Sequence, residues 1–359
     1  MMLIRKPPCH EDGHFYSPVV NTEDIAARFD AIWPSPAPDL LGIDWNDAFH
    51  LQVLREFFPR HIAGYDYPEV IERPPTPVVD APAHEPVQAD QAGDAALPAQ
   101  DLAAKQVASD DAAAPVPGDE SDGASEAQPA PQSEPGPEPE PEPEDAADLD
   151  VFYTRNSQFS WLDSRTLFVL LNEWAPKRMV EVGSGYSTLL SADVNRRFLG
   201  GAMALTCIEP YPRPFLAREG GLPGVTRLLQ ERVELVGMEP FLALQRGDIL
   251  FIDSSHVAKT GSDVNFLFFE VLPRLAPGVR IHIHDIHLPH EYPPEWVIAE
   301  NRSWNEQYLV RALLMYSTAF RVLFGCRYAI DRFPDLVRDA LALPNGRAFG
   351  GGSLWIERV

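Results

Sequence analysis

The second half of the chain alternates between short apolar runs and longer segments with helical apolar spacing. Runs of the kind that form buried strands occupy residues 178–182, 202–208, 225–230, 248–252, 279–283, 320–324 and 353–357. Helical spacing lies between some of them, at 162–174, 188–199 and 263–275. Strands that alternate with helices imply right-handed crossovers and a parallel sheet covered on both faces. The pattern therefore predicts a doubly wound, Rossmann-like α/β fold with a seven-stranded sheet.

Residues 1–71 have a different, mixed pattern that is rich in aromatic side chains. Residues 22–29 begin like a capped helix, and residues 47–58 have helical apolar spacing. About seventy residues are few for an independent hydrophobic core. We expect this helical and irregular extension to dock on a domain formed by residues 151–359.

Residues 72–150 hold most of the acidity of the chain. They contain 20 acidic and 2 basic side chains, or −18 of the net charge of −24, and they lack aromatic residues, Ile, Met and Cys. A segment rich in Ala, Pro, Asp and Glu buries too little apolar surface to offset the entropy of ordering it. We predict a disordered acidic linker or insertion, which leaves open a second use as a docking segment for a basic partner.

Composition also narrows the class of protein. Outside the acidic segment, the sequence has no cluster of Lys and Arg of the kind that binds nucleic acid. No apolar run is long enough to span a membrane. The start of the chain lacks the apolar core of a secretory signal. Cys9, Cys207 and Cys326 have no CxxC spacing, which argues against a disulfide scaffold and a thiolate zinc site. We expect a cytoplasmic protein; the oligomeric state is not indicated.

Polar residues and glycines directly follow the predicted strands, where a doubly wound sheet binds its ligands. The first group is Glu181-Val-Gly-Ser-Gly-Tyr-Ser187. Gly183 and Gly185 let a ligand approach the main chain, and free amides at the following helix start favour an anionic group. Thr188 replaces the third glycine of a GxGxxG motif, which disfavours a dinucleotide, and Glu181 suits an amine-bearing ligand. A simple tight turn remains the alternative.

An acid after the second predicted strand adds to this signal. Glu209 lies 24 residues after Gly185, and a carboxylate at that place can accept both hydroxyls of a ribose. Together, the glycine turn and Glu209 predict a nucleoside-containing cofactor. A surface acid before a proline turn is the alternative for Glu209 alone.

With Phe251-Ile-Asp253 after the fourth strand, these motifs resemble class I S-adenosylmethionine-dependent methyltransferases. Several blocks resemble an uncharacterised bacterial branch of that superfamily, over residues of about 10–70 and 151–359. The blocks are Gly13-His-Phe-Tyr-Ser-Pro18, Phe251-Ile-Asp-Ser-Ser-His256, Lys259-Thr-Gly-Ser-Asp-Val-Asn265, His282-Ile-His-Asp-Ile286 and Trp304-Asn-Glu-Gln-Tyr308.

The resemblance implies S-adenosylmethionine as cofactor. It places Gly183, Ser184 and Gly185 around the methionine part, Glu181 near its amine, Glu209 on the ribose and Glu231 near the adenine. The full set of expected cofactor-binding residues is Glu181, Gly183, Ser184, Gly185, Tyr186, Ser187, Glu209, Glu231, Asp253 and Ser254.

A hydroxyl acceptor must lose its proton as the methyl arrives, and a neutral imidazole suits that task. Asp-x-x-His, formed by Asp253 and His256, resembles sugar O-methyltransferases of macrolide pathways, which implies His256 as the general base. Asp253 and Asp285 end neighbouring strands and repel unless one is protonated or a cation bridges them. Similarity to metal-dependent O-methyltransferases implies Mg²⁺ on these two aspartates, although Ile286 stands where that pattern has a further acid or Asn.

Other interpretations stay open. The histidines at 282, 284, 287 and 290 could form a transition-metal cluster or be buried and hydrogen-bonded, and the aromatic residues Tyr292, Trp296, Trp304 and Tyr308 could form a lid or simply pack. Our leading hypothesis is O-methylation of a hydroxylated small molecule or glycan, catalysed through His256, Asp253 and Asp285. The alternatives are a nicotinamide-dependent oxidoreductase and a non-catalytic scaffold that keeps the fold.

Overall fold

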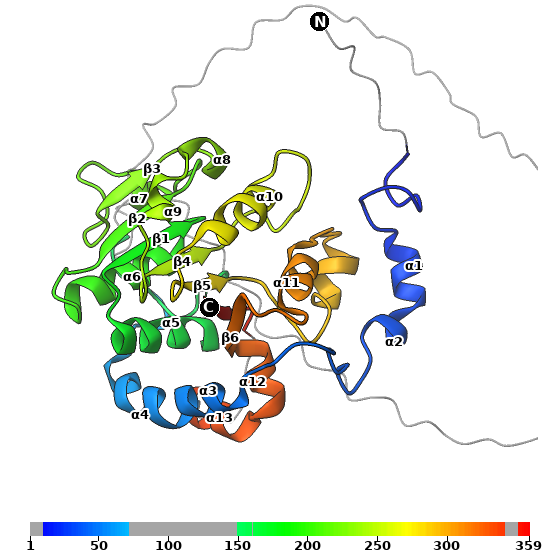
Figure 1. Ribbon diagram of the computed structural model, residues 1–359, viewed down its shortest axis with the longest axis horizontal. Helices are drawn as coiled ribbons and strands as arrows, with labels where there is room; N and C mark the ends of the chain where they lie inside the picture. Colours follow the sequence, from blue (N-terminus) through cyan, green and yellow to red (C-terminus); the bar gives the residue numbers. More distant parts are fainter. Residues whose placement is uncertain (1–9, 72–148, 160, 342–350) are drawn as a thin grey trace, which may run out of the picture. The chain divides into compact units, whose positions relative to one another are not determined.

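The computed structural model describes residues 10–71, 149–159, 161–341 and 351–359. A seven-stranded sheet with the strand order β3-β2-β1-β4-β5-β7-β6 lies at the centre (Figure 1). The strands are β1 Arg178–Val182, β2 Ala204–Ile208, β3 Arg227–Leu229, β4 Ile249–Ile252, β5 Arg280–Ile283, β6 Phe320–Gly325 and β7 Leu354–Arg358. The α/β fold and all seven strands are confirmed, with ends that differ from the predicted ones by a few residues.

The sheet is mixed, and this corrects the expectation of an all-parallel sheet. Strands β1 to β5 pair in parallel, whereas β7 pairs antiparallel with both β5 and β6. The apolar pattern of a buried strand carries no information about its direction, so the sequence could not distinguish the two cases. The order reverses at β1 and β4, which places the switch point of the sheet between these two strands.

The helices cover both faces of the sheet. Those of the N-terminal segment are α1 Thr22–Ala27, α2 Phe29–Ile32, α3 Asp47–Gln52, η1 Val53–Phe57, α4 Phe58–His61 and η2 Ile62–Gly64. Those up to β5 are α5 Trp161–Trp174, α6 Tyr186–Arg197, α7 Pro214–Ala217, α8 Val233–Val236, α9 Glu239–Leu242, α10 Asp263–Phe266, η3 Leu267–Val271 and η4 Leu272–Arg274. The last are η5 Glu295–Ala299, α11 Glu306–Leu314, α12 Cys326–Arg332 and α13 Pro334–Leu341.

Alternating strand residues face two separate apolar clusters. Met179 of β1 and Phe251 of β4 belong to the cluster that contains α5 and α6, whereas Val180 and Ile252 belong to the cluster that contains α10 and α11. This alternation follows from the two-residue period of a strand. The acidic side chain of Glu181 therefore points into the first cluster, where it is fully buried.

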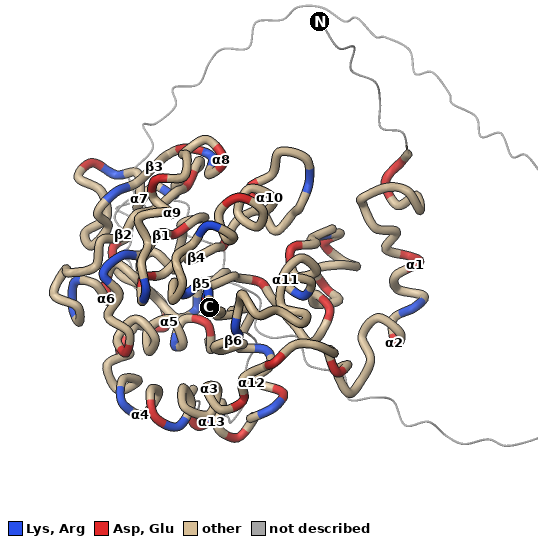
Figure 2. The backbone as a smooth tube through the Cα atoms, in the orientation of Figure 1, with Lys and Arg blue, Asp and Glu red and all other residues tan. Residues whose placement is uncertain are grey.

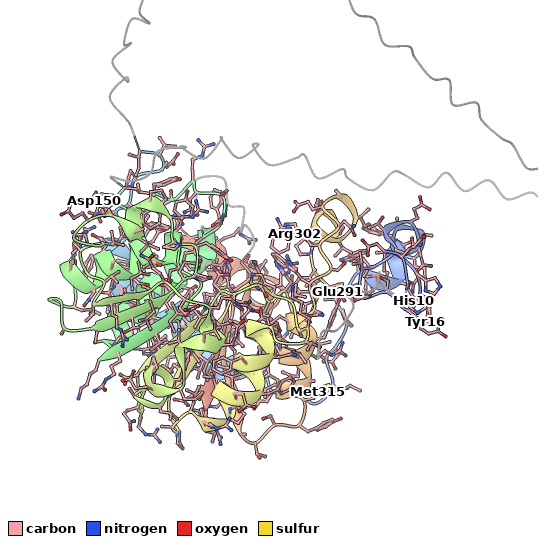
Figure 3. All side chains as sticks on the ribbon, turned by 90° about the horizontal axis from the view of Figure 1, so that it is seen from above. His10, Tyr16, Asp150, Glu291, Arg302 and Met315 are labelled. Atoms are coloured by element: carbon pink, nitrogen blue, oxygen red, sulfur yellow. The ribbon has the colours of Figure 1, made fainter. Side chains whose placement is uncertain are left out.

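The N-terminal segment shares the core of the sheet domain. Phe57 and Phe58 are buried in the cluster that contains α5, and the backbone N–H of Gly325 donates a hydrogen bond of 2.9 Å to Nε2 of His50. Helix α1 lies beside η5, and the segment with His10 and Tyr16 is drawn next to the part that carries Arg302 (Figure 3). The cap of α1 is Asn21, one residue before the expected position, because its Oδ1 accepts from the Asp24 amide.

The predicted acidic insertion lies outside the described residues except at its end. Leu149 is 5% exposed and packs in the same cluster as Phe152, so the packed core includes a residue before the predicted boundary at position 151. Over the described residues, basic and acidic positions are interspersed (Figure 2). Within that part of the chain, every helix is too short or too polar to cross a membrane.

Candidate functional site

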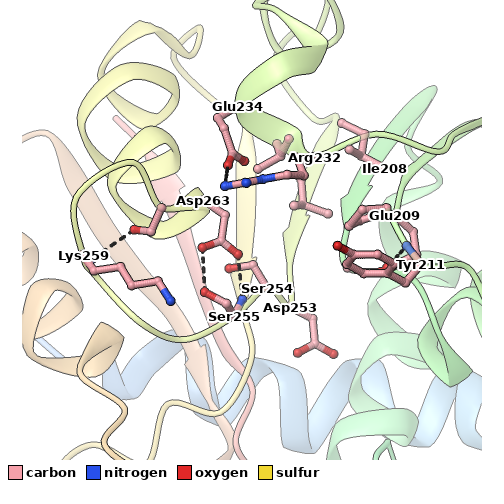
Figure 4. Close-up of a pocket in the computed structure, with 15 residues that line it drawn as sticks. Ile208, Glu209, Tyr211, Arg232, Glu234, Asp253, Ser254, Ser255, Lys259 and Asp263 are labelled. Carbon is pink, nitrogen blue, oxygen red and sulfur yellow. Dashed lines mark hydrogen bonds and ion pairs between the residues drawn. The ribbon is translucent and has the colours of Figure 1, made fainter. Parts of the chain in front are cut away.

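The carboxyl ends of the parallel strands open into two adjoining cavities. The first, of about 510 Å³, lies over β2 and β4 and is shown in Figure 4. The second, of about 830 Å³, extends from the turn after β1 toward β5 and the loop before α11. The two cavities share wall residues that follow three different strands: Gly183, Glu209, Tyr211, Asp253, Ser254 and Ser255. This is the edge at which the sequence predicted a ligand site.

The two glycines of the turn after β1 have different roles. Gly183 has a φ of +78°, and a Cβ at this position would lie 1.6 Å from the carbonyl oxygen of Asp253. The tight packing of the β1 turn against the end of β4 therefore requires glycine. At Gly185 a Cβ would meet only Oε1 of Gln158, at 4.0 Å, so this glycine leaves space in the second cavity. Its N–H donates to Oγ1 of Thr188, at 3.0 Å.

Glu181 lies beneath this turn rather than in a cavity wall. Its carboxylate accepts hydrogen bonds from Oγ of Ser187, at 2.6 Å, and from Sγ of Cys207, at 3.7 Å. Burial raises the pKa of Glu181 to about 7, despite the bond from Ser187 that favours the charged form. The side chain supports the turn from below. Its expected position near the cofactor amine stays a prediction.

Glu209 occupies the junction of the two cavities. Its Oε2 accepts a hydrogen bond of 3.0 Å from the Ser184 amide, and its Oε1 accepts one of 2.8 Å from the Tyr211 amide. These bonds fix both carboxylate oxygens at the end of β2 and leave lone pairs for a ligand. The ribose role of Glu209 stays a prediction.

Glu231 is not among the residues that line the far end of the first cavity, and its expected place near the adenine stays a prediction. Its side chain is exposed and its Oε1 accepts from the Arg232 amide, but it does not line the cavity. Arg232, Val233 and Glu234 do line it, and Arg232 and Glu234 form an ion pair (Figure 4). The residues with which the loop after β3 and the start of α8 line this cavity are therefore those that follow Glu231 in the chain.

Asp253, His256 and Asp285 meet in the wall of the second cavity. Nε2 of His256 lies 3.5 Å from Oδ1 of Asp253 and 3.4 Å from Oδ2 of Asp285. One donor atom from each residue lies within 4.8 Å of the others. Sequence reasoning predicted all three residues. It did not find Glu306, whose Oε2 lies 3.0 Å from Nδ1 of His256.

Carboxylates determine the charge of this cluster. His256 is buried, which alone would lower its pKa, but the nearby carboxylates of Asp253, Glu306 and Asp285 raise the pKa well above its ordinary value. The imidazole is therefore cationic when no other cation is present, the opposite of the neutral form that the sequence led us to expect. Burial raises the pKa of Asp285. Burial would also raise the pKa of Asp253, but the nearby His284 and His256 hold it below its ordinary value.

The four histidines after β4 do not form a common cluster. His282 is fully buried; its Nε2 lies 2.9 Å from Oγ of Ser353 and its ring stacks on Phe251. His290 pairs with Asp331 at 2.6 Å, and His287 does not line the second cavity, whereas His284 does. The transition-metal hypothesis for the four together is wrong, because the alternation of strand and loop directs them to different places.

Aromatic residues form the outer wall of the second cavity. The guanidinium carbon of Arg302 lies 4.6 Å from the ring centre of Trp296 and 4.7 Å from that of Trp304, and the Trp304 ring centre lies 4.3 Å from that of His256. Tyr292 is buried behind this wall, and Tyr308 is half exposed. The wall residues that sequence reasoning missed are Ser157, Gln158, Phe159, Tyr211, Arg213, Glu300 and Arg302. Scattered residues of this kind carry no local motif.

Comparison with known proteins agrees with this geometry. A family model described as a methyltransferase domain matches residues 180–286, which run from β1 to the end of β5. An uncharacterised protein of Archaeoglobus fulgidus is 32% identical over 99 residues. That match covers 28% of this chain, and the chain spans less than half, 45%, of the relative.

Solved structures with partial likeness include methyltransferases. An O-methyltransferase candidate from Klebsiella pneumoniae is 16% identical, with a TM-score of 0.33 over 55% of this chain and 79% of that one. An O-methyltransferase of tomaymycin synthesis from Streptomyces achromogenes, in complex with S-adenosylmethionine, is 16% identical, with a TM-score of 0.31 over 55% and 78%. TM-scores of this size are too low to transfer a site or an activity.

The sheet order and the flanking helices define a Rossmann-like α/β fold with a glycine turn after β1. Residues 180–286 match a methyltransferase domain, and this match agrees with the resemblance of the sequence motifs to class I S-adenosylmethionine-dependent methyltransferases.

Proposed function

We propose that the chain transfers the methyl group of S-adenosylmethionine to a hydroxyl of a small molecule or glycan. The observation that carries this proposal is the junction of the two cavities. There Gly183, Glu209 and Asp253 line both cavities, whereas Gly185 and His256 line only the second. Donor and acceptor would meet at the shared wall.

The residues of the donor side fit S-adenosylmethionine. Glu209 offers a fixed carboxylate for two hydroxyls of a sugar. The open space at Gly185 suits the methionine part, and Oγ of Ser254 is buried in the shared wall without a hydrogen-bond partner among the described residues. An apolar base would lie between Ile208 and Val233 in the first cavity. We propose these residues as the cofactor site.

The acceptor side suits a polar molecule with a ring face. Trp296 and Trp304 provide flat apolar surfaces, and Arg302 and Glu300 provide polar groups beside them. Sugar rings and other hydroxylated rings match a wall that combines aromatic faces with hydrogen-bonding groups. This match supports a small-molecule or glycan acceptor.

Oxygen methylation requires removal of a proton at this cluster. S-adenosylmethionine supplies a methyl group on a positive sulfur; a C–O bond forms, the C–S electron pair stays on sulfur, and the hydroxyl proton must leave. In the absence of another cation, His256 already holds a proton, so the carboxylates are the bases of the cluster. Burial raises the pKa of Asp285, which makes it the stronger base of the two aspartates. We therefore assign His256 to the organisation of the cluster rather than to base catalysis.

Calorimetry with S-adenosylhomocysteine and with NAD⁺ tests the proposal against its main alternatives. The proposal expects micromolar binding of S-adenosylhomocysteine and at least 100-fold weaker binding of NAD⁺. Tighter binding of NAD⁺ would favour the oxidoreductase. Absence of heat with either ligand at millimolar concentration would favour a scaffold that keeps only the fold.

A further inference from the structure

The geometry points to a divalent transition-metal site at Asp253, His256 and Asp285, in which His256 is a ligand through Nε2. This assignment differs from a magnesium ion held by the two aspartates with His256 as a base. It stands on side-chain positions alone, so it does not depend on the proposed methyl transfer.

The distances around Nε2 of His256 are the first argument. At 3.4 and 3.5 Å, the two carboxylate oxygens are beyond hydrogen-bond distance, which ends at about 3.2 Å. Ligand bonds of about 2.1–2.4 Å place right-angled ligand atoms about 3.0–3.4 Å apart. The two distances from Nε2 are close to this ligand spacing, and all three donor atoms lie within 4.8 Å of one another.

The orientation of the imidazole is the second argument. Nδ1 lies 3.0 Å from Oε2 of Glu306, a side chain with 0% exposure at the start of α11. The backbone oxygen of His256 in turn accepts from the Asn305 and Glu306 amides, which ties the two residues together. A carboxylate on Nδ1 fixes the proton there and directs the Nε2 lone pair at the aspartates, as in metal-bound histidines. Glu306 is thus a positioning residue.

The third argument is a buried nitrogen beside the cluster. His284 is 4% exposed and lines the second cavity. Its Nδ1 has no hydrogen-bond partner among the described residues, and its Nε2 lies 3.6 Å from Oδ1 of Asp285, again beyond hydrogen-bond distance. A buried polar atom of this kind needs a partner that the described residues do not supply. The ring therefore has unfilled hydrogen-bonding capacity next to Asp285.

The donor set selects the kind of ion. Mg²⁺ and Ca²⁺ prefer oxygen ligands only, whereas Mn²⁺, Fe²⁺, Co²⁺ and Zn²⁺ bind imidazole nitrogen together with carboxylates. One imidazole and two carboxylates supply two negative charges, so a divalent ion is neutralised. The site therefore favours a first-row transition ion or zinc over magnesium.

Titration of the chelator-stripped full chain with Mn²⁺, followed by electron paramagnetic resonance, tests this site. We expect one Mn²⁺ per chain and at least tenfold weaker binding of Mg²⁺ in competition. His256→Ala, Asp253→Asn and Asp285→Asn should each weaken Mn²⁺ binding at least tenfold. His290→Ala is the matched control, since His290 also pairs with an aspartate but lies outside the cluster, and it should stay within twofold.

Glu306 separates positioning from a structural role. Glu306→Ala should weaken Mn²⁺ binding about 10–100-fold, whereas Glu306→Gln keeps an oxygen that accepts from Nδ1 and should stay within about threefold. Circular dichroism and S-adenosylhomocysteine binding report whether each variant is folded.

A measurement on the unaltered chain tests the metal site without relying on variants that could fail to fold. With Co²⁺ bound, the proton on Nδ1 of a ligating His256 should give a paramagnetically shifted, exchangeable NMR signal. Absence of that signal, unchanged Mn²⁺ affinity in His256→Ala, or Mg²⁺ binding as tight as Mn²⁺ binding would overturn the assignment. None of these outcomes depends on methyl transfer.

Discussion

Oε2 of Glu209 accepts a hydrogen bond of 3.0 Å from the backbone amide of Ser184, which lies 25 residues earlier in the chain. The bond joins the turn after β1 to the end of β2, so the glycine turn and the acid act as one ligand frame. The sequence predicted each part separately. Their direct contact follows from the parallel pairing of β1 and β2.

The first prediction concerns Glu209. Glu209→Gln keeps one amide oxygen but loses the charge and one acceptor, so S-adenosylhomocysteine affinity should fall at least tenfold, or about 1.4 kcal/mol. Glu231→Gln is the matched control, because Glu231 lies near the same cavity but does not line it. Calorimetry should show its affinity within twofold of the unaltered chain. A larger loss of S-adenosylhomocysteine affinity in Glu231→Gln than in Glu209→Gln would instead assign the cofactor contact to Glu231.

The second prediction contrasts the two glycines of the turn. In Gly183→Ala the new Cβ meets the Asp253 carbonyl oxygen at 1.6 Å and φ is +78°, so the turn cannot form without displacement of β4. A melting temperature lower by more than about 8 °C, or no folded protein, is expected. Gly185→Ala adds a methyl group to open space and should melt within about 2 °C while binding S-adenosylhomocysteine several-fold more weakly. Equal melting temperatures would contradict the different roles.

The third prediction concerns pH and Glu181. Burial raises its pKa to about 7 in the folded chain, so the folded state binds a proton that the unfolded state releases above its ordinary pKa of 4.5. Stability is therefore lost as the pH rises from about 4.5 to 7, by at most about 3 kcal/mol. Glu181→Gln should remove this loss, so its stability relative to the unaltered chain should be higher at pH 8 than at pH 5. Urea unfolding at the two pH values measures the difference, and an equal difference at both would show that the carboxyl is not perturbed.

The fourth prediction concerns His50, which joins the N-terminal segment to the sheet domain. Burial lowers its pKa to about 4. The unfolded state therefore binds a proton first as the pH falls, and stability is lost between about pH 6.5 and 4. His50→Gln should reduce this acid-side loss but lower stability at pH 7.5, because the bond from the Gly325 amide is disturbed. His14→Gln, at an exposed position, is the control and should change neither.

Local patterns predicted the elements well where one face was buried. The strand at Arg178–Val182 was predicted with its observed ends because an apolar run is bounded by Lys177 and Gly183. The helix predicted at 263–275 is instead three consecutive segments, α10, η3 and η4. Apolar spacing does not distinguish an α-helix from a π or 3₁₀ turn, and Pro273 enforces a change in the last turn.

The site was predicted where its residues directly follow strands, and missed where they do not. Glu209, Asp253 and Asp285 follow apolar runs, so their convergence was expected. Arg302 lies on a loop and Glu306 lies at the start of α11. The positions of both depend on tertiary packing. Their charges carry no signal in a single sequence, and the effect of Glu306 on His256 appears only when the fold brings the two residues together.

A crystal structure with S-adenosylhomocysteine tests the central claim most directly. The account predicts that the ribose hydroxyls bind the Glu209 carboxylate, that the methionine part lies along Gly183–Gly185, and that the sulfur faces the cluster of Asp253, His256 and Asp285. A ligand bound elsewhere, or bound with its sulfur turned away from that cluster, would contradict it.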